Sequence, residues 1–218
     1  LVEHSISGPP DFPNLKAIFE ITGNYRSWTI GFTDSYYKHM EKMIGPSSNS
    51  DASHCILTLG YQYINGALQA EGFYKSGTGG LWLTGDYSKG RDAPAEPSSG
   101  SHMPSNVQAL ATFLTACSNQ ALVKDSASSQ MRRMMNNCFM TRILQDLGRP
   151  AAPTSFGKLG IGYDGTYYDA AVIERTTANG TPIRYVAIIL GSKGSQGLWR
   201  CGEFIDDFPS KVDEYEEL

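Results

Sequence analysis

Two short stretches carry most of the information in this sequence. They are Pro46-Ser47-Ser48-Asn49-Ser50-Asp51-Ala52 and Gly157-Lys158-Leu159-Gly160-Ile161-Gly162-Tyr163-Asp164-Gly165, and a long run of mostly helical pattern separates them. A hydroxyl near a carboxamide on a loop, together with a lysine followed by glycines at the start of a strand, can place donors and a cation around an acyl substrate. We therefore expect Ser47, Asn49 and Lys158 to line one groove.

The second stretch opens a region whose hydrophobic pattern has a period of two. Residues 168–175 and 183–190 are rich in β-branched side chains, and glycine-containing turns bound them. This pattern predicts an antiparallel hairpin, and the strand that contains Lys158 extends it to a meander of three strands. We expect residues 196–218 to begin as a helix that packs on this sheet.

The residues before the sheet have the periodicity of helices. A predicted helix begins at Thr33 or Asp34 and ends at Gly45-Pro46. Others are expected over residues 50–59 and 64–72, from Pro104, and over residues 129–147. We predict an α+β fold in a single domain, residues 1–218. It comprises an irregular lead at 1–31, a mostly helical part at 32–150 with a long loop at 76–103, and antiparallel strands with a terminal helix at 151–218.

Composition and charge exclude several classes of partner. The chain has 18 basic and 22 acidic residues among 218, and no basic cluster is interleaved with aromatics, so we expect neither nucleic acid nor a membrane as partner. The longest apolar run is far shorter than the roughly 20 residues of a membrane-spanning helix. The chain begins at Leu1 without a signal segment, so we expect a processed piece of a longer product whose compartment the sequence does not encode.

No metal or cofactor is predicted. The four cysteines lack a C-x-x-C pair, and the four histidines lack the spacing of metal ligands. Buried free thiols are the favoured interpretation of Cys55, Cys117, Cys138 and Cys201. The glycine run at 77–80 is not followed by the Gly-Lys-Ser or Gly-Lys-Thr of a phosphate-binding loop.

The two stretches also carry a family resemblance. Residues 47–60 resemble, without a gap, the segment of class A β-lactamases and related penicillin-recognising enzymes that holds their S-x-N signature. Residues 157–173 resemble their K-[ST]-G strand with the turn and strand that follow. Ser101-His102-Met103-Pro104, which opens a predicted helix, is similar to the turn after that family's omega loop, and Gly100-Ser101-His102-Met103 is also the spelling of a cloning scar. The resemblance covers most of residues 32–218 and implies a helical half with an antiparallel sheet flanked by helices.

The resemblance implies roles for individual residues. Ser47 matches the hydroxyl that shuttles a proton toward the leaving group, and Asn49 matches the carboxamide that holds the acyl side chain of the substrate. Lys158 matches the cation that anchors the substrate carboxylate and acidifies the neighbouring hydroxyl. Gly160 and Gly162 would let a substrate lie along the strand edge without a Cβ clash.

The long loop supplies a further candidate. Counting back from Met103, Asp86 is the nearest match to the loop acid that activates the deacylating water in this family, and Asp92 and Glu96 lie further along the loop. The alternative interpretations are structural: a helix cap for Ser47 to Asn49, a solvated strand start for Lys158, and a solvated loop acid for Asp86.

The sequence departs from the family at two points. Leu159 stands where the family carries a serine or threonine that binds the substrate carboxylate, and no Ser-x-x-Lys helix precedes the S-x-N loop at the family's distance. Ser35-Tyr36-Tyr37-Lys38 has the right letters but lies on the helix leading into that loop, so we expect the Ser35 hydroxyl to lie outside the groove. Ser155-Phe156-Gly157-Lys158 has them on a strand, where serine and lysine fall on opposite faces.

Three hypotheses about function remain. The first is a β-lactamase-like serine hydrolase domain that acts on an amide or ester of a small acyl or peptide-like substrate, with its nucleophile on a segment outside this chain. The second is a noncatalytic binding module of the same fold, and the third is a self-contained hydrolase that uses Ser35. We also expect the apolar edge at residues 183–190 to be covered by residues 1–30, by a second copy in a homodimer or by an N-terminal fragment.

Overall fold

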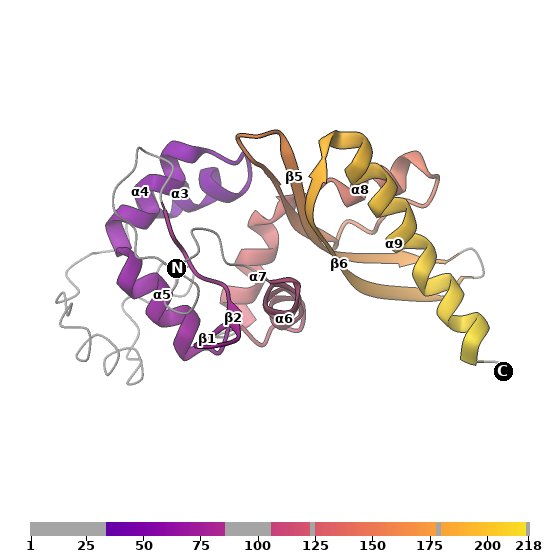
Figure 1. The fold of residues 1–218 in the computed structure, drawn as a ribbon, viewed down its shortest axis with the longest axis horizontal. Coiled ribbons are helices and arrows are strands. Elements are labelled where there is room, and N and C mark those ends of the chain that lie inside the picture. The colour runs from indigo at the N-terminus through magenta and orange to yellow at the C-terminus, as the bar shows by residue number, and fades with distance from the viewer. Residues whose placement is uncertain (1–33, 86–105, 123–124, 178–179, 217–218) are drawn as a thin grey trace. The chain divides into compact units, whose positions relative to one another are not determined.

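The computed structural model describes residues 34–85, 106–122, 125–177 and 180–216 (Figure 1). The chain divides into two compact units, Leu1–Met134 and Met135–Leu218. The prediction of a single domain stays a prediction. The irregular lead at 1–31, Asp86 and Gly100 to Met103 lie outside the described residues.

The first unit is mostly helical, as predicted. Its elements are α3 (Asp34–Ile44), α4 (Asn49–Leu59), α5 (Tyr61–Ala70), the short hairpin β1 (Tyr74–Lys75) and β2 (Gly79–Gly80), α6 (Val107–Ser118) and α7 (Asp125–Met134). Gly60 ends α4 at a φ of 86°, a conformation that a glycine adopts without a Cβ clash. Met40, Cys55, Leu59, Tyr63 and Met134 form the buried core, which joins α3, α4, α5 and α7.

The second unit contains the predicted meander. Its elements are β3 (Asn136–Asn137), α8 (Met140–Asp146), β4 (Phe156–Ile161), β5 (Thr166–Thr176), β6 (Pro182–Lys193) and α9 (Gly194–Glu216). The strand order is β3-β4-β5-β6, with β3 parallel to β4 and the other pairs antiparallel. The α+β fold class and the hairpin of residues 168–175 with 183–190 are therefore confirmed.

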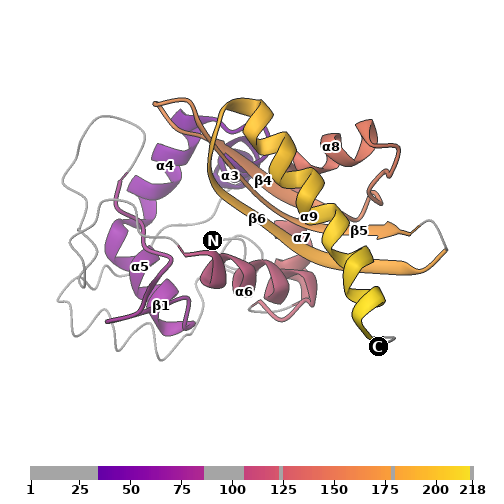
Figure 2. The same ribbon diagram turned by 45° about the vertical axis from the view of Figure 1, so that its right-hand side comes forward.

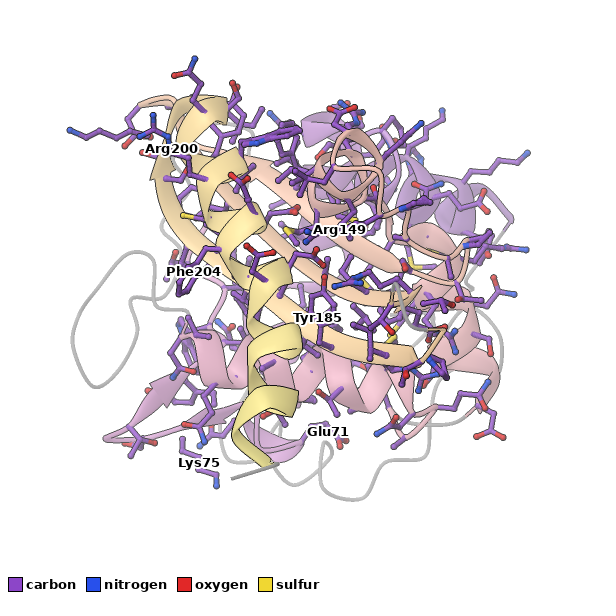
Figure 3. All side chains as sticks on the ribbon, turned by 90° about the vertical axis from the view of Figure 1, so that its right-hand side faces the viewer. Glu71, Lys75, Arg149, Tyr185, Arg200 and Phe204 are labelled. Atoms are coloured by element: carbon purple, nitrogen blue, oxygen red, sulfur yellow. The ribbon has the colours of Figure 1, made fainter. Side chains whose placement is uncertain are left out.

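One face of this sheet carries the core of the second unit. Alternate residues of β5 and β6 pack against α8 and α9, and the buried members include Ala171, Ile173, Ala187, Ile143 and Leu198. Each large side chain buried in this way contributes roughly 1.5–3 kcal/mol. Figures 2 and 3 show α9 lying across the strands, with Arg149 and Tyr185 to one side of the helix and Phe204 to the other.

The prediction of one helical run over residues 129–147 was wrong. The structure divides this run into α7, β3 and α8. Asn136 and Asn137 pair with Gly157 and Lys158 of β4, and the carboxylate of Asp169 accepts hydrogen bonds from the backbone N–H groups of Phe139 and Met140. These partners are distant in sequence, so helical periodicity alone could not reveal the break.

Part of the predicted long loop is ordered by one buried side chain. Asn65 is 2% exposed, and its amide donates to the carbonyl of Leu83 at 2.9 Å and accepts from the backbone N–H of Leu83 at 2.7 Å. Both hydrogen-bonding groups of the amide are therefore used to hold residue 83 against α5.

Two further observations concern the cysteines and the helices. All four cysteines are free, and Cys55, Cys117 and Cys138 are buried as predicted, whereas Cys201 is exposed. None of the helices in the described ranges is long and apolar enough to cross a membrane.

Candidate functional site

Ser47 and Asn49 lie on the short loop between α3 and α4. The loop leaves α3 through hydrogen bonds from Gly45 N to Glu41 O (2.9 Å) and from Ser48 N to Lys42 O (3.0 Å). Ser47 has a φ of 64°, in the left-handed region that a residue with a Cβ seldom adopts. Ser47 and Asn49 are both exposed. The loop therefore presents both predicted residues at the surface, with backbone strain of the kind found at functional sites.

The helix cap on this loop is made by Ser48. Its Oγ accepts a hydrogen bond from Asp51 N at 3.3 Å and donates a short one to the Asp51 carboxylate. This pair differs from a capping box, because the Asp51 carboxylate accepts from the Ser48 hydroxyl while the Ser48 backbone N–H donates to Lys42 O. The capping role expected as the alternative for this segment thus belongs to Ser48.

A histidine that the sequence analysis did not single out joins this cap. His39 Nδ1 lies 2.5 Å from Asp51 Oδ1, and the ring of His39 lies 4.1 Å from that of His54. The hydrogen bonds from Ser48 and, next, His39 lower the pKa of Asp51, which is an ionised carboxylate at neutral pH. The only signal in the sequence was an acid and a histidine on two successive helices.

Lys158 lies on β4 in the second unit. Its Nζ donates to the carbonyl of Leu159 at 2.7 Å, and the side chain is half-buried rather than fully solvated. Burial lowers the pKa of Lys158, while the charge of Asp169 opposes this shift. A lysine with a lowered pKa exchanges protons more readily near neutral pH.

Asp169, on β5, binds the backbone at the start of α8. Its carboxylate accepts from Phe139 N at 3.0 Å and from Met140 N at 2.8 Å, and the residue is 1% exposed. Burial raises the pKa of Asp169 to about 6, although the two N–H groups and Lys158 act in the other direction. A carboxyl group that titrates near neutral pH therefore lies beside the strand of Lys158.

This pKa predicts a pH dependence of stability in the second unit. The unfolded carboxyl ionises near its ordinary value of 3.8 and the folded one near about 6, so the folded state binds more protons between these values. The contribution of Asp169 to the free energy of unfolding is present below about pH 4 and is lost as the pH rises through about 6, by on the order of 3 kcal/mol. Urea unfolding of the wild type and of Asp169→Asn from pH 4 to 7 measures it. A difference between the two that does not change with pH would contradict the prediction.

The glycines of β4 and its turn differ in how much space the neighbouring atoms leave for a Cβ. A Cβ added at Gly157 would lie 2.4 Å from Ala170 O, whereas one at Gly160 would meet only Tyr168, at 3.6 Å. A Cβ at Gly162 would lie 2.6 Å from the carboxylate of Asp164, which accepts hydrogen bonds from the backbone N–H and the hydroxyl of Thr166. Packing therefore requires a glycine at 157 but not at 160.

The outer edge of β4 is paired over only part of its length. Among the described residues, β3 pairs with Gly157 and Lys158 and with no later residue of β4. Leu159, at the position of departure from the family, packs its side chain against the core of the second unit. The placement of Gly160 and Gly162 beside a substrate stays a prediction.

The predicted site residues thus form two groups. Ser47 and Asn49 share a loop in the first unit, and Lys158, Gly160 and Gly162 share β4 and its turn in the second. A groove formed by both groups stays a prediction. The side chain of Ser35 lies outside the described part of the chain. Ser155 has a structural role, because its hydroxyl accepts from Glu174 N at 2.9 Å and donates to Glu174 O at 3.2 Å.

Comparison with known proteins identifies the fold. No protein-family model and no curated protein sequence matches the chain. Among solved structures, an ancestral class A β-lactamase (GNCA) is 17% identical with a TM-score of 0.52, over 89% of this chain and 81% of that chain. A variant of the class A β-lactamase of the last common ancestor of Gram-negative bacteria (GNCA4), bound to the transition-state analogue 5(6)-nitrobenzotriazole, is 17% identical with a TM-score of 0.54, over 91% and 81%.

A second variant of that ancestral enzyme is 18% identical with a TM-score of 0.51, over 86% of this chain and 76% of that chain. At such low identities the likeness concerns the fold and not the chemistry. The chain therefore has the fold of class A β-lactamases, as the resemblance of its two stretches predicted.

Proposed function

We propose that this chain is the β-lactamase-like part of a serine hydrolase that acts on an amide or ester of a small acyl substrate. The acylating nucleophile would come from a segment outside this sequence. The observation that carries the proposal is Lys158, a half-buried lysine with a lowered pKa on β4, within the fold of class A β-lactamases.

In this proposal each residue has one task. Lys158 binds the anionic end of the substrate, and the Ser47 hydroxyl passes a proton to the leaving group. Asn49 holds the acyl side chain through its amide, and the edge of β4 at Gly160 receives the substrate backbone. The attacking hydroxyl adds to the carbonyl carbon, its proton passes by way of Ser47 to the leaving group, and the bond to that group breaks to leave an acyl-enzyme ester. Water then hydrolyses this ester, which releases the acid and restores the hydroxyl.

A noncatalytic binding module is the second candidate. It is favoured by Leu159, which offers no hydroxyl to a substrate carboxylate and whose side chain packs against the core. Such a protein would keep the strand edge for binding without forming a covalent bond.

Covalent labelling separates these candidates. The chain by itself, and the chain extended by its natural upstream residues, are incubated with a penicillin and with a fluorophosphonate, and the intact mass is measured. We expect an adduct only on the extended chain. An adduct on the chain alone that Ser35→Ala abolishes would support the self-contained hydrolase, and labelling of neither form would support the binding module.

The substitution Lys158→Ala tests the proposed role of this lysine, and Lys193→Ala is its matched control. We expect Lys158→Ala to slow labelling of the extended chain by about 100-fold, the scale of one positioned acid–base or electrostatic group. Lys193→Ala removes the same charge from an exposed position at the end of β6 and should leave the labelling rate unchanged. Equal rates for the two variants would exclude the proposed role.

A further inference from the structure

A pocket of about 870 Å³ lies within the second unit, and it includes neither Lys158 nor the glycines of β4. It is formed by the segment that follows α8, the end of β5 and the beginning of β6. Each of the three contributes one arginine to the lining: Arg149, Arg175 and Arg184. The sequence analysis singled out none of them.

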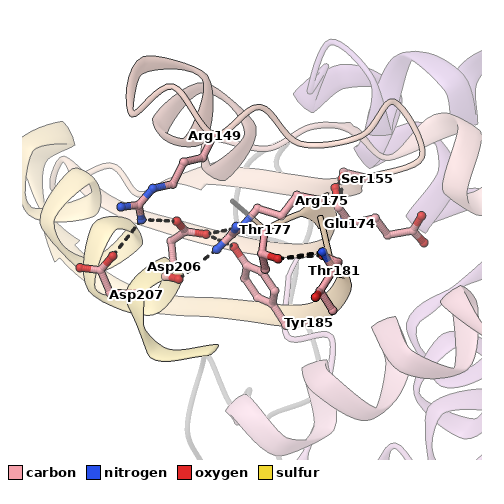
Figure 4. Close-up of polar contacts among 9 residues, drawn as sticks. All are labelled: Arg149, Ser155, Glu174, Arg175, Thr177, Thr181, Tyr185, Asp206 and Asp207. Carbon is pink, nitrogen blue, oxygen red and sulfur yellow. Dashed lines mark hydrogen bonds and ion pairs between the residues drawn. The ribbon is translucent and has the colours of Figure 1, made fainter. Parts of the chain in front are cut away.

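The carboxylate partners of these arginines use only part of each guanidinium. Arg149 Nη1 donates to Asp206 Oδ2 at 2.9 Å and to Asp207 Oδ1 at 2.8 Å (Figure 4). Arg184 Nε lies 2.8 Å from Glu174 Oε1. A guanidinium has five N–H donors. Among the described residues, Nη2 of Arg149 and both terminal nitrogens of Arg184 donate to none.

Arg175 is the most buried of the three. Its side chain is 4% exposed, and its Nε lies 2.7 Å from Asp206 Oδ1 as an ion pair whose N–H is not aligned for a hydrogen bond. Its Nη2 donates to the backbone carbonyl of Asp206 at 3.3 Å. A buried cation with a poorly aligned donor in the wall of a pocket favours a ligand that brings acceptors.

The acidic side chain in the lining of the pocket is already engaged by neighbouring groups, which also favours an anionic ligand. Glu174 is the acid among the lining residues, and its carboxylate is engaged by Arg184 and by the hydroxyl of Thr154. The planar fork of a guanidinium matches carboxylate and phosphate oxygens. The volume lies within the range of 300–1,000 Å³ usual for small-molecule sites.

We propose that this pocket binds a small organic oxyanion, a molecule that carries a carboxylate or phosphate group, through Arg149 and Arg184 with Arg175 in the wall. Asp206 and Asp207 offset part of the positive charge, so binding in the millimolar range is expected. The site is independent of the proposed hydrolase function, because it shares no residue with the groove of that proposal.

The test uses titration with citrate and with glucose 6-phosphate at constant ionic strength, followed by the arginine Nε–H signals in nitrogen-15 NMR spectra. Saturable shifts are expected for at least one probe, and the stronger binder identifies carboxylate or phosphate as the preferred group. Arg184→Gln should weaken that binding about tenfold, since it removes charge-assisted hydrogen bonds from an exposed position.

Arg200→Gln is the matched control. It removes the same charge from the same unit, and Arg200 lies on α9 well away from Arg149 in Figure 3. We expect its affinity to remain within twofold of the wild type. Linear shifts without saturation, or equal weakening by Arg184→Gln and Arg200→Gln, would overturn the proposal.

Discussion

Replacing Asp206 with alanine is expected to lower the free energy of unfolding of the second unit by about 3–5 kcal/mol. Asp206 is fully buried on α9, and its carboxylate contacts three groups at once. These are Arg149 Nη1 at 2.9 Å, Arg175 Nε at 2.7 Å and the hydroxyl of Tyr185 at 2.8 Å (Figure 4). The substitution would leave the buried guanidinium of Arg175 without its anion, and an unpaired buried charge is far more costly than a lost surface pair.

Asp207→Ala provides the control for this prediction. Asp207 accepts from the same Arg149 nitrogen at 2.8 Å, but 45% of its side chain is exposed, so we expect a loss below about 1 kcal/mol. Urea unfolding followed by circular dichroism and by NMR signals of the second unit measures both variants. If the two losses were equal, Asp206 would not be the residue that holds α9 to the sheet.

Tyr185 offers an independent readout of the same network. Burial and the hydrogen bond to Asp206 raise the pKa of its phenol well above the ordinary value of 10. The substitution Asp206→Ala removes this hydrogen bond, so the phenol should titrate at a lower pH than in the folded wild type. Ultraviolet titration of tyrosinate absorbance detects this shift, provided that the variant remains folded at the start of the titration.

Gly157→Ala is expected to cost about 3 kcal/mol, the upper end of the range for overpacked sites. The new Cβ would lie 2.4 Å from Ala170 O and 2.7 Å from Ala171 Cα, and both are backbone atoms of the neighbouring strand β5. That strand is paired with β6 along its whole length and cannot move aside alone. The pairing of β4, which carries Lys158, should therefore weaken.

The matched substitution is Gly160→Ala on the same strand. Its Cβ would make an ordinary contact with Tyr168 at 3.6 Å, so we expect the stability to remain within about 0.5 kcal/mol of the wild type. Chemical denaturation compares the two variants directly. A larger loss for Gly160→Ala than for Gly157→Ala would show that the strand is packed differently from this description.

The elements that the sequence predicted correctly are those with a strong local signal. The strands at 168–175 and 183–190 alternate between two faces and are separated by a short turn, so local pattern and tertiary pairing agree. The ends of α3 at Ile44 and of α4 at Leu59 were predicted because Pro46 interrupts the helical hydrogen bonding and because Gly60 is a favoured left-handed cap at the end of a helix. The run at 129–147 failed because its break depends on β4 and Asp169, which lie later in the chain.

The sequence predicted which residues belong to the candidate site, but not their contacts or their pKa shifts. The two motif-bearing stretches predicted Ser47, Asn49 and Lys158 as site residues. That prediction came from a resemblance to class A β-lactamases, and comparison with solved structures confirms their fold for this chain. No local pattern shows that His39 on α3 meets Asp51 on α4, or that burial lowers the pKa of Lys158. Both depend on which surfaces come together when each unit folds.

The sequence by itself determined the α+β class, the meander and the family resemblance, because helix ends, strand alternation and motif spacing are local properties of the chain. Only the tertiary structure decided that Arg149, Arg175 and Tyr185 converge on Asp206, and that a pocket opens beside these arginines. These residues come from the segment after α8, from two strands and from a distant helix. Their charges interact strongly because folding removes Asp206 and Arg175 from water, and sequence order carries no record of that burial.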